Sequence, residues 1–595
     1  MNSRRGLWCG LLLAVALAGC KSGPNSVNGP ILPSTPAPTP TPTPSISSLS
    51  PASATAGGPG FTLTVTGSNF ASPSTVQWIN TGNPGFIGGT ATFVSSTQLT
   101  LQISAANIAI PTSVQVTVSV NGVSSNTLTF PISPAASAGA QLVSTGANGA
   151  TPNGSSHNPV LSFNGRFVAF SSDATNLIVP NTNFAEAYVH DTCLGVDGCT
   201  ASTLLASAVN GGPAASPAEG NSLGGASPSI GWQGFLPPSG ALSLPAGRYI
   251  GFLSAANNLI SPLTAFQQAY MRDTCFGAAA PSGCVPSTVL ASVTEISGEP
   301  NGAASEFVLA SNTCDGAFVS AGTNLVNGVA IPNEVYLVSC GNVGLFQFGF
   351  TNTTLVSAGF AGAPGDQGGH QPAITADGRF VAFASTSSNL TGVPNAGNQQ
   401  IYLRDTCLRM GSGCTPSTTM VSVDNAGNAL SGSSQIPALS DDGRFVVFST
   451  QTPAAGGGVT SDVLLHDTCN SSSAPVAGCS PSTVTISVAA TGASANGPSN
   501  SSAHAVSGDG RFVAFSSSAT NILAGGNPAA QVFVRDMCNT SSGSIPGCTP
   551  RTVLISSNGN GPIGGLNGAI SHDGHFVAFE NETSIFQIFV AATGF

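Results

Sequence analysis

The sequence predicts an all-β protein in which a β-sandwich is followed by a seven-bladed β-propeller. The first observation is a phrase, clearest as VSGDGRFVAFS at Val506–Ser516, that recurs at a nearly regular interval over most of the chain. The second is that the 41% of hydrophobic residues fall in short runs of Val, Phe, Ile and Leu between turn residues, as in strands. The third is a lone strand-like segment before the first copy, which can complete the last copy and close a ring.

The composition excludes one class of function. The 595 residues carry a net charge of −11 at pH 7, with 13 Lys and Arg residues in all. Phosphate recognition needs a basic patch, and no run of Lys and Arg follows Arg5. We therefore expect no binding of nucleic acid.

The first residues have the layout of an export signal. Arg4 and Arg5 precede an apolar stretch that is short for a membrane span. The stretch ends in Leu-Ala-Gly-Cys20, which resembles the bacterial lipoprotein signal and implies removal of residues 1–19 and acylation of Cys20. An ordinary signal peptide and a short membrane anchor are the alternatives. The resemblance predicts an exported protein held to the cell envelope membrane by a lipid, and Lys21 after the cysteine favours the outer membrane, on its periplasmic side or at the cell surface.

Two segments separate the signal from the repeats. Residues 20–44 are rich in Pro and Thr and predict a stiff extended linker. Residues 45–134 contain about seven short strands, the rhythm of an immunoglobulin-like sandwich. The runs FTLTVTGSNF (Phe61–Phe70), VQW (Val76–Trp78), STQLTLQI (Ser96–Ile103) and VQVTVSVNG (Val114–Gly122) make this segment similar to the IPT/TIG family. Trp78 is expected in the core, with a sugar-stacking platform as the alternative.

The seven copies of the phrase share a glycine. These glycines are Gly165, Gly247, Gly316, Gly378, Gly443, Gly510 and Gly574, with the copy around Gly316 degraded. Each unit divides into four strands, and four-stranded units repeated radially make a propeller. The seventh unit ends after its third strand, and Gln141–Thr145 supplies the missing one, so residues 140–595 form a ring without an open edge. The phrase resembles the TolB-like propeller repeat, and its Asp-Gly step is interpreted as a turn device.

Twelve cysteines remain after the signal and the lipid site, and we predict six disulfides. Five local pairs follow the third strands of their units: Cys193/Cys199, Cys275/Cys284, Cys407/Cys414, Cys469/Cys479 and Cys538/Cys548. Cys314 and Cys340 end the first and third strands of the third unit and form the sixth pair. Zinc is the alternative, but no pair has a second pair or histidines nearby.

Candidate binding residues lie in the connections. The longest, Gly211 to about Leu244, carries Trp232 and Phe235 between the first and second units. Because long connections are often functional, we predict a binding surface there, on the face of the fourth-to-first and second-to-third connections. An inert insertion is the alternative.

Three histidines precede first strands and could converge near the mouth of the channel. They are His157, His370 and His504, and three imidazoles would suit a metal or an acid/base centre. His504 is two residues out of register, and no carboxylate recurs beside them, so solvated loop histidines are preferred. We predict no metal site and no cofactor.

Enzyme motifs are weak. The segments 220–224 and 559–564 fit G-x-S-x-G and G-x-G-x-x-G, but neither has the helix that its chemistry requires. The predicted function is a non-catalytic binding or protein assembly platform, with protein or glycan as the ligand. The alternatives are a hydrolase or lyase acting on polysaccharide at the channel mouth and a carbohydrate-binding surface protein.

Overall fold

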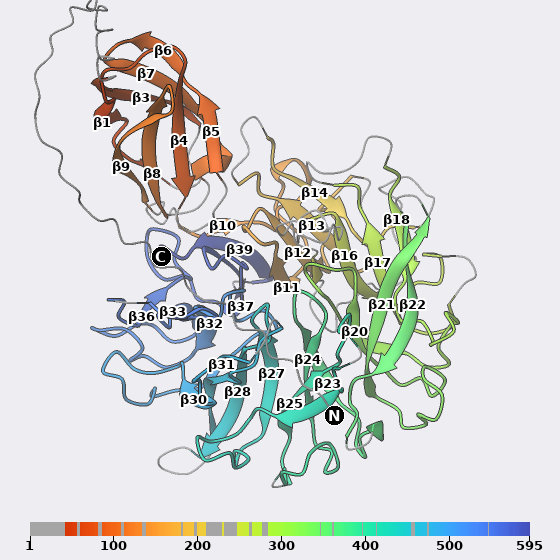
Figure 1. The fold of residues 1–595 in the computed structure, drawn as a ribbon. Helices are drawn as coiled ribbons and strands as arrows, with labels where there is room; N and C mark the ends of the chain where they lie inside the picture. Colours follow the sequence, from red (N-terminus) through yellow and green to blue (C-terminus); the bar gives the residue numbers. More distant parts are fainter. Residues whose placement is uncertain are drawn as a thin grey trace, which may run out of the picture. The chain divides into compact units, whose positions relative to one another are not determined.

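The computed structural model describes residues 42–595 except 56–59, 81–85, 109–111, 134–138, 180–181, 195–198, 210–228, 231–246, 261–263, 277–283, 345–346, 360–361, 396, 412, 454–458, 473–474, 546 and 583. These residues form strands and connections, with two short 3-10 helices, η1 (Ala105–Ile108) and η2 (Ala147–Gly149). No α-helix occurs among them, so the all-β prediction is confirmed for the described part of the chain (Figure 1).

The first folded segment is a sandwich of two sheets. One sheet has the order β1 (Ser45–Ser50), β3 (Phe61–Ser68), β7 (Gln98–Ile103) and β6 (Thr92–Ser95). The other has the order β2 (Ala54–Thr55), β9 (Val123–Ser133), β8 (Thr112–Val120), β4 (Ser74–Asn80) and β5 (Phe86–Thr90). Side chains alternate along β3, because Leu63 and Val65 are buried while Thr62 and Thr66 are exposed.

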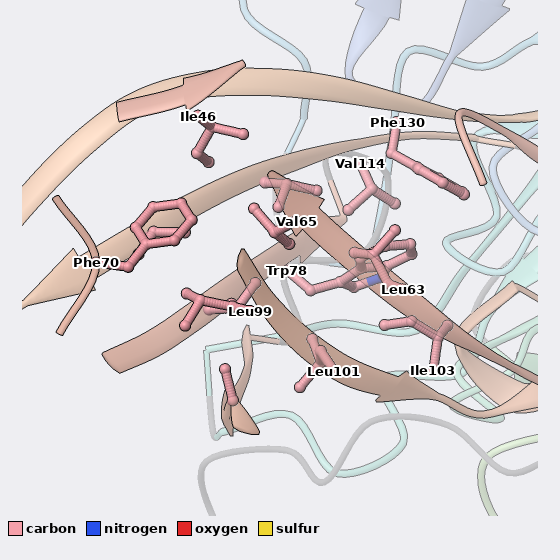
Figure 2. Close-up of a cluster of buried hydrophobic side chains, with 14 of the residues drawn as sticks. Ile46, Leu63, Val65, Phe70, Trp78, Leu99, Leu101, Ile103, Val114 and Phe130 are labelled. Carbon is pink, nitrogen blue, oxygen red and sulfur yellow. The ribbon is translucent and has the colours of Figure 1, made fainter. Parts of the chain in front are cut away.

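Trp78 belongs to the core of this sandwich. It is 1% exposed, and its ring centroid lies 5.0 Å from that of Phe130. Figure 2 shows Trp78 among Leu63, Val65 and other apolar side chains of both sheets. The core interpretation is therefore confirmed, and Trp78 offers no exposed ring face to a sugar.

The repeats form seven four-stranded antiparallel sheets, numbered here in chain order. Sheet 1 is β11 (Ser156–Leu161), β12 (Phe167–Ser172), β13 (Glu186–Asp191) and β14 (Ser202–Leu205). Sheet 2 is β15 (Ser229–Ile230), β16 (Tyr249–Ser254), β17 (Gln268–Asp273) and β18 (Ser287–Leu290). Sheet 3 is β19 (Ala304–Leu309), β20 (Gly316–Ser320), β21 (Glu334–Gly344) and β22 (Gln347–Leu355). Sheet 4 is β23 (His370–Ile374), β24 (Phe380–Ser385), β25 (Gln400–Asp405) and β26 (Ser417–Met420).

The last three sheets follow the same plan. Sheet 5 is β27 (Ser434–Leu439), β28 (Phe445–Pro453), β29 (Val459–Asp467) and β30 (Ser482–Thr485). Sheet 6 is β31 (Ser499–Asn500), β32 (Phe512–Ser517), β33 (Gln531–Asp536) and β36 (Arg551–Leu554), with a small hairpin of β34 (Asn539–Thr540) and β35 (Gly543–Ser544) before its last strand. Sheet 7 is β37 (Leu566–Ile570), β38 (Phe576–Glu582), β39 (Phe586–Ala592) and, from before sheet 1, β10 (Gln141–Leu142).

The four strands of each sheet are called A to D in pairing order. Because the sheets are antiparallel, the A–B and C–D connections lie at one end, the A–B side. The B–C connections and the links to the next sheet lie at the other end, the B–C side.

A hydrophobic cluster fills each junction between successive sheets. Both faces of strand B contribute to these clusters. In sheet 1, Phe167 and Ala169 pack toward sheet 2, whereas Val168 and Phe170 pack toward sheet 7. Six junctions join sheets 1 to 7 in chain order, and the seventh joins sheet 7 to sheet 1. The repeated Phe-Val-Ala-Phe thus fills the space between sheets, as its alternation predicts.

Strand β10 joins the last sheet as the sequence predicts. Leu142 pairs with Phe589, and the Val143 N–H donates to the Ile588 carbonyl at 2.7 Å. The Val143 side chain is 1% exposed, in the cluster between sheets 7 and 1. The segment before sheet 1 is therefore built into the far end of the chain.

In the third copy of the phrase, the predicted match of Gly316 with the turn glycines of the other copies is wrong. Leu309 pairs with Gly316 in sheet 3, whereas Ile374 pairs with Val381 in sheet 4. Gly316 therefore matches Val381, inside strand B, and Thr313 takes the place of the turn glycine. The Asp-Gly step of Asp315 and Gly316 produced the misalignment, since it has the composition of the turn but lies three residues later.

The turn glycines of the intact copies are held against the preceding sheet. A Cβ on Gly510, whose φ is 79°, would lie 2.0 Å from Cδ2 of Phe445 in sheet 5. Gly165 makes the equivalent approach to Phe576 of sheet 7, so the junction between the last and first sheets repeats the geometry of the others. Glycine is required here both for its conformation and for lack of space.

Replacing Gly510 by alanine is expected to destabilise the repeats more than replacing Gly492. Gly492 has a similar φ of 83°, but a Cβ there would meet nothing within 4 Å. Gly492→Ala should cost about 1 kcal/mol for its left-handed backbone, and Gly510→Ala about 1–3 kcal/mol more for the clash with Phe445. Urea unfolding of the two variants measures the difference, and equal midpoints would contradict the packing.

Candidate functional site

Five sheets carry an arginine and aspartate ion pair at the end of strand C. The pairs are Arg166–Asp191, Arg248–Asp273, Arg379–Asp405, Arg444–Asp467 and Arg511–Asp536, with Nη2 to Oδ2 distances of 2.6 to 2.8 Å. Each Nε also donates to Oδ1, so the pairs are bidentate. Each guanidinium lies 4.6 to 5.0 Å from the centroid of the next aromatic ring in the chain.

The same aspartates hold the disulfide loops. In sheet 5, the Asp467 Oδ1 accepts the Cys469 N–H at 2.9 Å, and Cys469 is bonded to Cys479. The other four pairs repeat this arrangement. In sheet 3, which lacks the ion pair, the Cys314–Cys340 disulfide links the A–B connection to strand C. All six predicted disulfides are confirmed.

These five loops do not have the chemistry of zinc sites. An aspartate oxygen and two cysteine sulfurs lie within 4.8 Å of one another in each loop. Zinc needs thiolates, and the sulfurs are bonded to each other. The arrangement is therefore structural. The ion pairs were not predicted from the sequence, although an Arg after the turn glycine and an Asp two residues before a Cys recur in the same five units.

The A strands of sheets 1, 4, 5 and 7 each contain a bulge. The bulge residues Asn158, Gln371, Ile436 and Asn567 have φ values of 53 to 55°. Such a conformation costs about 1–2 kcal/mol for a β-branched residue such as Ile436, so surrounding contacts must hold it.

Side chains of neighbouring sheets hold these bulges. Glu580 of sheet 7 accepts the Asn158 N–H at 2.8 Å, and Glu306 of sheet 3 accepts the Gln371 N–H. The Gln371 Oε1 accepts the Ile436 N–H at 2.9 Å. Ser501 of sheet 6 donates to the Ile436 carbonyl at 3.0 Å. The inner strands are thus linked from sheet to sheet by side chains.

The A strands, with the segment that follows β31, line two cavities. The larger, here called the inner cavity, has a volume of about 220 Å³, and residues of sheets 1, 3, 4, 5, 6 and 7 line it. Its polar lining includes Glu306, Gln371, Ser501, Ser502, His504 and Asn567, and its apolar lining includes Pro159, Pro372 and Pro437. The second cavity, about 100 Å³, lies toward the A–B connections and also contacts His504, with Asp441 and His572.

Burial changes the protonation of the groups in these cavities. It raises the pKa of Glu306 to about 7, against the stabilising N–H of Gln371. It lowers the pKa of His504 to about 4, and the buried Nε2 of this ring has no hydrogen-bond partner in the described structure. Asp441 contacts His572, and burial raises the pKa of the carboxyl while it lowers that of the imidazole to about 3. At neutral pH, both histidines are therefore uncharged.

The three predicted histidines do not form one centre. His157 lies 3.2 Å from the Glu580 carboxylate and packs on Phe586. His370 lines a different pocket of about 270 Å³ with residues of sheets 3 and 4, such as Ser305 and Asn333. His504 alone lines the inner cavity. His157 and His370 lie within their A strands, whereas His504 follows strand A of sheet 6, so the three imidazoles have different neighbours.

The predicted binding loop lies mostly outside the described residues. Trp232 and Phe235 lie outside the described residues, as does Cys20. However, strand A of sheet 2 is Ser229–Ile230, because Ile230 pairs with Ile250. This strand lies inside the predicted connection from Gly211 to about Leu244, so sheet 2 begins earlier in the chain than the sequence predicts.

Two findings bear on the compartment. Six disulfides in one chain indicate an extracellular or periplasmic location, since reducing compartments keep thiols free. Among the described residues, no helix is long and apolar enough to cross a membrane.

Comparison with known proteins identifies the sandwich. The IPT/TIG domain family matches residues 44–132, so this segment is an IPT/TIG domain, as its strands predict. No curated protein matches the chain in sequence.

Several solved structures match the chain at low similarity. Trypanosoma rangeli sialidase in complex with sialic acid has 10% identity and a TM-score of 0.29, over 76% of this chain and 57% of that one. A mutant of that sialidase with trans-sialidase activity has 9% identity and the same TM-score over 77% and 57%. An ancestral GH74 enzyme has 11% identity and a TM-score of 0.23 over 89% and 84%. This chain thus spans about 57% of the length of the sialidase chains.

Proposed function

We propose that residues 140–595 form a seven-bladed β-propeller of the TolB-like type, which acts as a non-catalytic binding or assembly platform at the cell envelope. The seven equivalent junctions, including that between sheets 7 and 1, support the propeller. The pairing of β10 with β39 supports its closure by the N-terminal strand.

One observation carries the proposal of a platform: the charged side chains at the ends of the C strands, in the turns and in the inner strands hold the fold. Five aspartates at strand C are bound by arginine, and Glu306 and Glu580 hold the backbone of bulges. Asp442 and Asp509 accept hydrogen bonds within their turns. A general acid or nucleophile must be free to exchange protons or attack, and these groups already have structural partners.

We further propose that the chain is a lipoprotein with Cys20 as the acylated residue. In this proposal, residues 1–19 are removed, residues 20–44 form a spacer, and residues 45–134 are the sandwich domain. Metabolic labelling with a fatty acid should mark the wild-type chain and not Cys20→Ser. Label that remains on the variant would refute the lipid site.

Binding without turnover tests the platform. The mature full-length chain is applied to an array of glycans and incubated with polysaccharides, and products are analysed by mass spectrometry. Binding to a glycan or to an envelope protein without product formation is the expected result. Product that requires the intact chain would favour the alternative of a hydrolase or lyase.

A further inference from the structure

In the repeats, the positively charged residues lie toward one end of the strands. Of the 13 Lys and Arg residues, Arg4, Arg5 and Lys21 precede the sandwich, and the other ten are arginines of the repeats. Five are the ion-paired arginines of the A–B connections, Arg409 and Arg551 lie at C–D connections, and Arg272, Arg404 and Arg535 are penultimate in strand C. Every cation of the repeats therefore lies at or near the A–B side.

The B–C side carries acids instead. Asp173, Glu299, Asp366 and Asp424 are exposed in its connections, and Glu186 and Glu334 begin C strands there. Residues 210–246 contain no Lys or Arg in the sequence. The field at this end is negative without a local cation, so it attracts positively charged ligands.

The inner cavity has one carboxylate and no cation among its described lining residues. Glu306 lies near the start of β19, toward the B–C side, and one of its oxygens accepts the Gln371 N–H. The other titratable group of the lining, His504, is uncharged at neutral pH. On neighbouring inner strands, His157 is paired with Glu580, and burial lowers the pKa of His370. A desolvated carboxylate in such surroundings is favourably paired by a cation from outside.

The remaining lining fits a short aliphatic stem. Val308, Pro159, Pro372 and Pro437 give apolar surface around the acid. The volume of about 220 Å³ corresponds to roughly seven water molecules at about 30 Å³ each. This is room for a chain of a few carbon atoms with one charged end.

We propose that the inner cavity binds an ammonium group on a short aliphatic stem, with Glu306 as its counter-ion. The inference rests on the proposed binding role and names the chemistry that the site recognises. The ammonium can belong to a free alkylamine or to a lysine side chain of a partner protein.

Calorimetric titration of the mature full-length chain with n-butylammonium chloride at pH 8 tests the proposal. Saturable binding of n-butylammonium is expected, with no binding of n-butanol or butyrate at the same concentration. Glu306→Gln should weaken binding at least tenfold, since the charge is lost while the acceptor for the Gln371 N–H is kept. Glu299→Gln removes one of several exposed acids of the B–C side, which accepts the Ala265 N–H and does not line the cavity, and should change the affinity by less than about twofold.

The pH dependence follows from the raised pKa of Glu306. Because the cation binds the ionised carboxylate, affinity should be full above about pH 7 and fall about tenfold per pH unit below it. A peptide with one lysine, compared with the same peptide carrying glutamine, distinguishes the sources. Tighter binding of the lysine peptide than of n-butylammonium would assign the site to a partner protein, and the reverse to a free amine.

Three results would overturn the proposal: no saturable binding, equal binding of n-butanol, or unchanged binding by Glu306→Gln with an unaltered melting temperature. None of them depends on product formation, which is the result that refutes the platform. Failure of the cavity and failure of the proposed function are thus separate outcomes.

Discussion

Replacing Asp467 by asparagine is expected to lower the free energy of unfolding of the repeats by about 3–5 kcal/mol. The substitution leaves Arg444 without its bidentate partner, and that arginine side chain is only 6% exposed. The guanidinium keeps only neutral partners, the carbonyls of Thr540 and Ser541, which do not compensate its buried charge as a carboxylate does. Asparagine can still accept the Cys469 N–H, so the turn into the disulfide loop is kept and the loss reports on the charge.

The equivalent change in sheet 6 is the matched control. Asp536→Asn removes the partner of Arg511, whose side chain is 31% exposed and can reach water. We expect a clearly smaller loss, toward the roughly 1 kcal/mol of exposed pairs. Chemical denaturation with the disulfides intact compares the two variants. Equal losses would contradict the assignment of the sheet 5 pair as buried.

Replacing Val143 by aspartate is expected to destabilise the repeats by about 3 kcal/mol or more. Val143 follows β10 and lies between sheets 7 and 1, against Ile588 and Val590. A carboxylate placed there has no cation nearby, since the described arginines lie at or near the A–B side. The loss arises only if the N-terminal strand is part of the last sheet.

Gln141→Asp controls for the added charge. Gln141 lies in the same strand and is exposed. This variant should unfold at nearly the wild-type denaturant concentration. Similar behaviour of Val143→Asp and Gln141→Asp would mean that the segment does not pack on sheet 7.

Much of the fold could be predicted because it is repeated. Seven copies gave seven sheets, and the repeated frame around the cysteines gave five of the six disulfides. The sixth, Cys314–Cys340, followed from the expected ends of two strands in one unit. A local periodic signal suffices for these features, because each strand and each loop disulfide is set by residues near it in the chain. The burial of Trp78 could be predicted because aromatic side chains in the middle of a strand are generally buried.

The errors came from single copies that depart from the repeat. In sheet 3, Asp315 and Gly316 have the composition of the turn, yet they lie at the start of strand B. In sheet 2, strand A has only two residues, Ser229 and Ile230, so the sequence prediction included it in a long connection. A single sequence does not show which copy of the repeat is shifted relative to its strands, because the shift is visible only in the strand pairing of the sheet.

The candidate site could be predicted from the sequence less completely than the fold. No sequence motif points to Glu306. What distinguishes this residue is its burial and the hydrogen bond that it accepts from the Gln371 N–H in another sheet. The bulges at Asn158 and Ile436 have no shared residue type, since only their backbone conformation is common. His504 was identified from its place before strand A, but its isolation from His157 and His370 depends on contacts between sheets.

A cross-link between β10 and β39 tests the closed ring most directly. Leu142 and Phe589 are paired residues of these strands, although they lie at opposite ends of the repeats. In the double variant Leu142→Cys and Phe589→Cys, oxidation should form a disulfide nearly completely, detected by mass spectrometry as one peptide that joins both segments. A folded chain that forms its six native disulfides but not this one would contradict closure of the ring by the N-terminal strand.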